Sequence, residues 1–73
     1  MKRKLYALAK KLGAEILKYE SARDGGTQTF EIEAKLDCGE IVYGGDCYFI
    51  GDPNGKQKLL SYFKSIWMKT TRL

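Results

Sequence analysis

One stretch of this sequence, residues 27–36, alternates between apolar and polar side chains, and this alternation limits the possible folds more than any other feature. A period of two is typical of a strand that is buried on one face and solvated on the other. The polar face would carry Glu31 and Glu33 and would therefore be acidic. The apolar face would join the core, and its members are Phe30, Ile32, Ala34 and Leu36.

The residues after this strand predict a β-hairpin over about residues 27–43. Asp37-Cys38-Gly39 has the composition of a tight turn, and Ile41-Val42-Tyr43 begins a returning strand. The sequence leaves the register open, because turns of two and of three residues place Ile41 on opposite faces.

Residues 46–50 follow a break at Gly44-Gly45 and allow two interpretations. They form either a short third strand or a helical turn capped by Asp46. Their β-branched and aromatic content favours the strand. The sheet would therefore have two or three antiparallel strands.

Amphipathic patterns at the two ends of the chain predict two helices. Over about residues 2–20, apolar side chains recur at helical spacing, with Lys and Arg on the opposite side. Gly13 interrupts this pattern at a cost of about 1 kcal/mol relative to Ala, and we interpret it as a point of close backbone approach. The second helix spans about residues 54–71, with Asp52 as one possible N-cap and Pro53 at the first helical position.

These elements predict one domain, residues 1–73, of the α+β class. Two helices would pack on one face of a two- or three-stranded antiparallel sheet, in the order α-β-β-(β)-α. The apolar arc of the last helix is wider than one small sheet requires. It would either wedge between the first helix and the hairpin or be partly covered by a second chain. The expected core consists of Leu5, Leu8, Leu12, Ile16, Phe30, Ile32, Leu36, Phe49, Leu59, Phe63, Ile66 and Trp67.

The residue types that are absent argue against an enzyme. The chain has no histidine, the side chain most often used for proton transfer near neutral pH. Neither Cys38 nor Cys47 therefore has a histidine to activate it, and two thiols cannot complete a tetrahedral zinc shell. We expect no metal and no cofactor. Both cysteines should be reduced and partly buried, with a labile or intermolecular bridge as the alternative.

The sequence also predicts a cytoplasmic protein without a membrane span. No window approaches the ~18 apolar residues that a transmembrane helix needs. The basic start of the chain is not followed by an uninterrupted apolar segment, because Lys10, Lys11 and Glu15 break it up. A signal peptide requires such a segment.

Charge is segregated along the chain. Residues 1–20 carry six Lys and Arg, residues 21–54 carry seven carboxylates against two basic residues, and residues 55–73 carry no acid. If the two helices lie side by side, their outward basic side chains would neutralise phosphates, and the affinity would fall steeply with salt. The predicted nucleic-acid-binding residues are Arg3, Lys4, Lys10, Lys11, Lys18, Lys58, Lys69 and Arg72.

Two other interpretations of the same pattern stay open. A lysine-rich helix face is often only a solubilising surface. Alternatively, the chain is a protein-interaction module, either a homodimer in which basic helices meet an acidic hairpin or an inhibitor of a host complex. Aromatic and apolar flank residues would anchor such an interface, and the candidates are Tyr6, Leu17, Leu60 and Trp67.

Gly55-Lys56-Gln57-Lys58 opens the last predicted helix, and the predicted elements run helix, three strands, helix. This order resembles that of the double-stranded-RNA-binding domain, a family in which basic residues at the start of the last helix contact phosphates. The resemblance covers topology only. The chain has no histidine for the family's central loop, and it has Tyr62, Phe63 and Trp67 where the family has an alanine-rich helix.

A second resemblance is carried by Leu12-Gly13-Ala14-Glu15-Ile16 ahead of a hairpin and by Gly45-Asp46-Cys47. Over about half of the chain, these segments resemble short uncharacterised proteins of phages and prophages. The resemblance implies a mobile-element accessory protein that acts by binding. Such a protein would be a nucleic-acid accessory factor or an inhibitor of a host complex such as a host-defence nuclease, and the resemblance implies no site residues.

Overall fold

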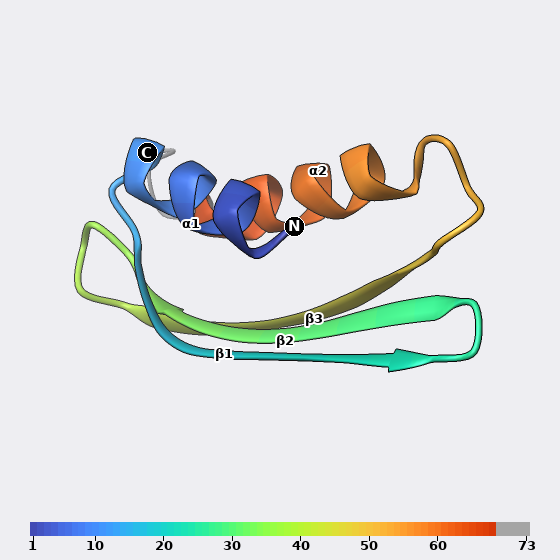
Figure 1. The fold of residues 1–73 in the computed structure, drawn as a ribbon. Coiled ribbons are helices and arrows are strands. Elements are labelled where there is room, and N and C mark those ends of the chain that lie inside the picture. The colour runs from blue at the N-terminus through green and yellow to red at the C-terminus, as the bar shows by residue number, and fades with distance from the viewer. Residues whose placement is uncertain (69–73) are drawn as a thin grey trace.

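The computed structural model describes residues 1–68 and contains two helices and three strands. In chain order the elements are α1 (Lys2–Lys11), β1 (Glu15–Asp24), β2 (Thr27–Lys35), β3 (Ile41–Phe49) and α2 (Gly55–Trp67). The strands form one antiparallel sheet in the order β1-β2-β3, and both helices cover the same face of it (Figure 1). The predicted α+β class, with two helices on one face of an antiparallel sheet, is therefore confirmed.

The first helix is shorter than predicted, since it ends at Lys11 and residues 15–24 form a strand. Gly13 ends the helix with a left-handed backbone, φ +79°, which favours glycine. The N–H of Gly13 donates to the carbonyl of Lys10, and the N–H of Ala14 donates to the carbonyl of Ala9 at 2.8 Å. These two bonds form a Schellman motif, which terminates a helix. The predicted helix over residues 2–20 is therefore right for residues 2–11 and wrong for residues 12–20.

A β-bulge in β1 explains why the spacing of its apolar residues suggested a helix. Ile16 pairs with Ala34, and Tyr19 pairs with Ile32, with a register shift between Ile16 and Lys18. The extra residue places Ile16 and Tyr19 on the same face of the sheet although they are three positions apart. Three-residue spacing is also helical spacing, so the pattern fits both structures.

β3 passes through Gly44-Gly45 without a break and continues to Phe49. Residues 46–49 are therefore strand, as their composition favoured, but they extend the returning strand and are not a separate third one. Gly44 faces α2, and a Cβ there would clash with Ile66 and lie 3.0 Å from Phe63 Cε1. Glycine at this position lets the helix pack directly on the strand. The third strand of the sheet is instead β1.

The core lies between the helices and the sheet, and it contains most of the residues predicted for it. Seven of those predicted are buried, while Leu8, Leu12, Ile16 and Ile66 are half-buried against the cluster. Phe49 is the exception, with 68% of its surface exposed. It pairs with Thr27 and shares that residue's face, which points away from the helices. The seven buried members are Leu5, Phe30, Ile32, Leu36, Leu59, Phe63 and Trp67.

The register of the β2–β3 hairpin fixes which side chains lie on the outer face of the sheet. Lys35 pairs with Ile41, and Glu33 pairs with Tyr43, so Ile41 and Tyr43 lie on the polar face. Phe30, Ile32 and Ala34 are buried on the other face, as the alternation predicted. We call the side of the sheet that is not covered by helices the open face. It carries Lys18, Glu20, Glu31, Glu33, Ile41, Tyr43, Cys47 and Phe49.

Candidate nucleic-acid interface

The two helices carry only positive charge. α1 contains five Lys and Arg, α2 contains three, and neither contains Asp or Glu. All nine carboxylate residues of the chain lie between residues 15 and 52, in the strands and their connections. Because the helices form one layer and the sheet the other (Figure 1), charge segregated along the chain is also segregated between the layers. We call the α1 and α2 side of the molecule the helical layer. Its basic residues are Lys2, Arg3, Lys4, Lys10, Lys11, Lys56, Lys58 and Lys64.

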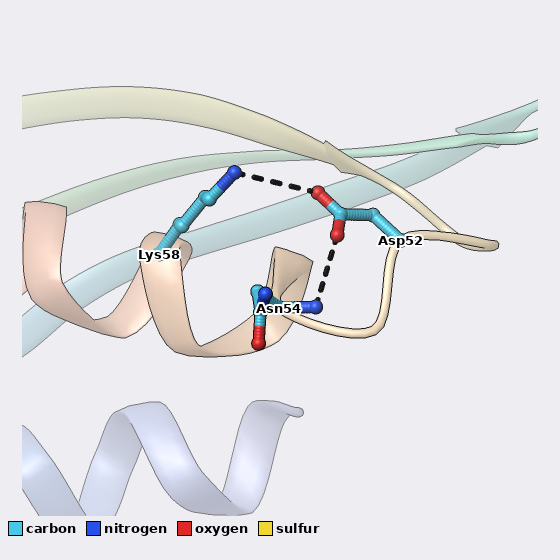
Figure 2. Close-up of polar contacts among 3 residues, drawn as sticks. All are labelled: Asp52, Asn54 and Lys58. Carbon is cyan, nitrogen blue, oxygen red and sulfur yellow. Dashed lines mark hydrogen bonds and ion pairs between the residues drawn. The ribbon is translucent and has the colours of Figure 1, made fainter.

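The basic side chains of the helical layer are exposed, and within the described residues all but Lys58 lack an acidic partner. Within residues 1–68, the one ion pair of this layer joins Lys58 Nζ to Asp52 Oδ2 at 3.7 Å (Figure 2). Its Lys58 side chain is 74% exposed, so solvent screens the attraction. No ion pair in this part of the chain joins α1 to a carboxylate. The cations of α1 are therefore available to an external anion.

Asp52 has a different structural role from the predicted one. α2 begins at Gly55, its N-cap is Asn54, and Pro53 lies before the helix and not at its first position. Asp52 Oδ1 accepts a hydrogen bond from the Asn54 N–H at 2.9 Å, and its other oxygen pairs with Lys58 (Figure 2). Asp52 thus orders the turn before α2 and pairs with Lys58, which lies near the start of that helix.

Of the predicted nucleic-acid-binding residues, five lie in the helical layer and one does not. Lys18 is on β1 and lies on the open face, where its Nζ is 3.7 Å from Glu20 Oε2. Lys18 was assigned to the first helix, but that helix ends at Lys11, seven residues before it. Lys69 and Arg72 lie outside the described residues. The five in the helical layer are Arg3, Lys4, Lys10, Lys11 and Lys58, and the layer also contains Lys2, Lys56 and Lys64, which were not among the predicted residues.

The predicted protein-interface residues do not form one surface. Trp67 is 1% exposed, and its ring packs against Phe63 at 5.3 Å between centroids, so it is a core residue and the interface assignment was wrong. Leu60 is half-buried against the same core. Tyr6 is exposed on α1, whereas Leu17 is exposed on β1. α2 contacts both α1 and β3, and these two contacts account for its wide apolar arc.

The open face carries apolar side chains that the sequence did not assign to a surface. Ile41, Tyr43 and Phe49 each expose more than half of their surface there. A shallow hollow of about 200 Å³ lies beside Tyr43, between Glu31 and Glu33. Desolvation and the negative charge of Glu31 raise the pKa of Tyr43 above its usual value. The sequence signal for this surface is the alternation of side chains along β3. It shows which residues face outward only when the register of the strands is known.

Both cysteines are more accessible than predicted. Cys38, in the β2–β3 turn, and Cys47, on the open face, are free and exposed. They were expected to be partly buried, but β3 alternates so that residue 47 points away from the helices. Within the described part of the chain, no three side chains are grouped as a metal site would require, and no helix is long and apolar enough to cross a membrane.

Comparisons with known proteins do not place the chain in a family: no protein-family model, curated protein or solved structure matches it. The resemblances to double-stranded-RNA-binding domains and to phage proteins therefore stay predictions.

Proposed function

We propose that this protein is a non-enzymatic cytoplasmic module that binds nucleic-acid phosphates through its helical layer. The observation that carries the proposal is the composition of that layer, which has eight exposed basic residues, no acidic residue and one ion pair within residues 1–68. Surfaces with this charge density attract a polyanion and release its condensed counterions on binding.

The opposite layer supports one orientation of the bound polyanion. The open face carries Glu20, Glu31 and Glu33, which would repel phosphate. The helical layer would therefore face the nucleic acid while the sheet faces away. The order helix, three strands, helix resembles that of double-stranded-RNA-binding domains, and Lys56 and Lys58 lie in the first turn of α2, where that resemblance implies phosphate contacts.

The test compares two double charge reversals with the same change in net charge. Lys10→Glu with Lys11→Glu alters the helical layer, and Lys18→Glu with Lys35→Glu alters the sheet. Fluorescence anisotropy with a generic labelled duplex should show binding at low salt by the wild type and by the sheet variant. The helix variant should not bind. Equal loss in both variants, or unchanged binding by the helix variant, would reject this site.

A protein-interaction module is the second candidate function, and the apolar side chains of the open face favour it. Tyr43 is 65% exposed and Phe49 is 68% exposed, and both lie on the same face of β3, where a partner could cover them. The partner in this proposal is a second copy of the chain. Light scattering at physiological salt should then give a dimer mass that Tyr43→Ser with Phe49→Ser reduces to that of a monomer. An apolar interface persists at salt concentrations that abolish phosphate binding, so the two functions are separable.

A further inference from the structure

A cleft lined by aromatic rings lies next to the positively charged start of α1. β1 and β2 extend beyond this end of the helix (Figure 1), and the cleft of about 240 Å³ lies between Met1, Lys2 and the helix-facing side of the sheet. We call it the aromatic cleft. Apart from Met1, the residues that line it are Lys2, Tyr19, Ser21, Gln28, Phe30 and Tyr48.

Three rings, one from each strand, form the apolar wall of the aromatic cleft. Phe30 of β2 is buried between the other two. The Tyr48 ring is nearly parallel to it, at 6.1 Å between centroids and 11° between planes, and the Tyr19 ring meets it edge-on at 6.2 Å. Tyr19 and Tyr48 are half-buried, so each remains partly accessible. Because Phe30 is 2% exposed, the accessible part of this wall comes from Tyr19 and Tyr48.

A cation, the Lys2 ammonium group, lies beside the aromatic wall. Lys2 Nζ lies 5.4 Å from the centroid of the Tyr19 ring and 5.8 Å from that of Tyr6, within cation–π range. Arg3 lies beside it, around an adjoining open hollow lined by Lys2, Arg3 and Tyr6. A ligand with a flat ring and a negative charge would thus meet an aromatic wall and a cation together.

Polar groups complete the lining. The Gln28 side-chain amide donates to the carbonyl of Ala22 at 3.0 Å, which leaves its carbonyl oxygen as an acceptor. Ser21 contributes a hydroxyl from β1. The volume is smaller than the roughly 300 Å³ at which pockets for drug-sized ligands begin. It suits one planar heterocycle and not a larger ligand.

We propose that the aromatic cleft binds one unpaired nucleobase of a single-stranded nucleic acid, whose phosphates lie along the basic residues at the start of α1. This inference rests on the proposed function and specifies that the nucleic acid is single-stranded. A base within a duplex is paired and stacked and cannot enter, whereas an unpaired base can stack on an aromatic side chain. Because every base has a π-face, the cleft would accept all of them with little sequence preference.

The test uses two labelled single-stranded oligonucleotides of equal length. One carries bases and the other is abasic, so that only the bases differ. By anisotropy at low salt, the wild type should bind the base-containing strand at least about fivefold more tightly. Tyr48→Leu should remove this preference and leave the affinity for the abasic strand unchanged. Tyr43→Leu changes a tyrosine on the other face of the same strand and should preserve the preference.

The outcomes separate this inference from the proposed function. Equal wild-type affinity for both strands would overturn the nucleobase cleft and leave phosphate binding standing, whereas no salt-dependent binding of either strand or of a duplex would overturn the proposed function itself. Photocrosslinking of a 5-iodouracil strand to the wild-type protein needs no variant. A crosslink to Tyr19 or Tyr48 supports the cleft, and crosslinks confined to other residues overturn it.

Discussion

Tyr43 lies across Gly45 on the open face, so that its hydroxyl interacts with Glu31 although Glu33 is its direct cross-strand partner. A Cβ on Gly45 would be 3.5 Å from the Tyr43 hydroxyl oxygen, which shows how closely the side chain passes. Glu31 is the cross-strand partner of Gly45. The tyrosine therefore leans along its strand over Gly45 and reaches the next cross-strand pair, an arrangement in which an aromatic side chain covers a strand glycine.

This geometry predicts that Glu31→Gln lowers the pKa of Tyr43. The carboxylate of Glu31 disfavours the phenolate by charge repulsion, while desolvation, the larger cause, is unaffected by the substitution. The pKa should therefore fall towards its usual value without reaching it. NMR titration of the Tyr43 ring measures the change. Glu33→Gln is the matched control, and an equal shift in that variant would contradict the assignment.

The contact of α2 with β3 predicts that Gly44→Ala destabilises the protein. The added methyl would clash with Ile66 and press on the buried Phe63 ring, and overpacking of this kind costs about 1–3 kcal/mol. Gly45→Ala, one residue away on the other face, meets only ordinary contacts and should be nearly neutral. Urea denaturation measures both. Adding Ile66→Val to Gly44→Ala removes the clashing methyl and should restore part of the loss; no restoration would place the strain elsewhere.

The sequence predicted the fold class and the strand at residues 27–36 because two-residue alternation has one structural meaning. It did not predict β1, because a bulge spaces Ile16 and Tyr19 as a helix would. Gly13 was the deciding residue, since its left-handed backbone ends α1 and directs the chain into the sheet. A glycine inside an apparent helix is compatible with either structure, and only the hydrogen bonds that follow it distinguish them.

The candidate site was predictable where it depended on local composition. The basic residues of α1 lie on a helix under either boundary, so Arg3, Lys4, Lys10 and Lys11 remain together. Lys18 depended on the boundary and moved to the opposite layer. The aromatic cleft joins residues from three strands and the chain start, so it depended on a register that no local pattern encodes.

The burial of Trp67 predicts a loss of stability and not of an interface when it is truncated. Trp67→Ala should cost about 3–5 kcal/mol, because it removes a large ring from beside Phe63 and leaves a cavity. Tyr6→Ala truncates an aromatic residue that is 41% exposed and should cost much less. Chemical denaturation of the two variants provides the comparison. Similar costs would show that Trp67 is not a core residue.

The environment of Tyr19 predicts a loss of stability at alkaline pH. Burial raises the pKa of Tyr19 above its usual value of about 10, so the unfolded chain ionises first as pH rises. This contribution to stability is fully present below pH about 10 and is lost as pH rises through the folded-state pKa. Urea denaturation across this range should show a shallower decline for Tyr19→Phe. The same decline in both proteins would show that Tyr19 titrates normally in the folded state.

The layered charge predicts how salt affects binding when single lysines are neutralised. If Lys10 contacts a phosphate, Lys10→Gln should reduce the slope of log affinity against log salt concentration by about one unit. Lys35→Gln has the same effect on net charge, but it lies on the acidic sheet and should leave the slope unchanged. Anisotropy titrations over a range of salt concentrations measure both slopes. Equal changes would mean that the protein responds to net charge alone, and the helical layer would then have no special role in contacting the polyanion.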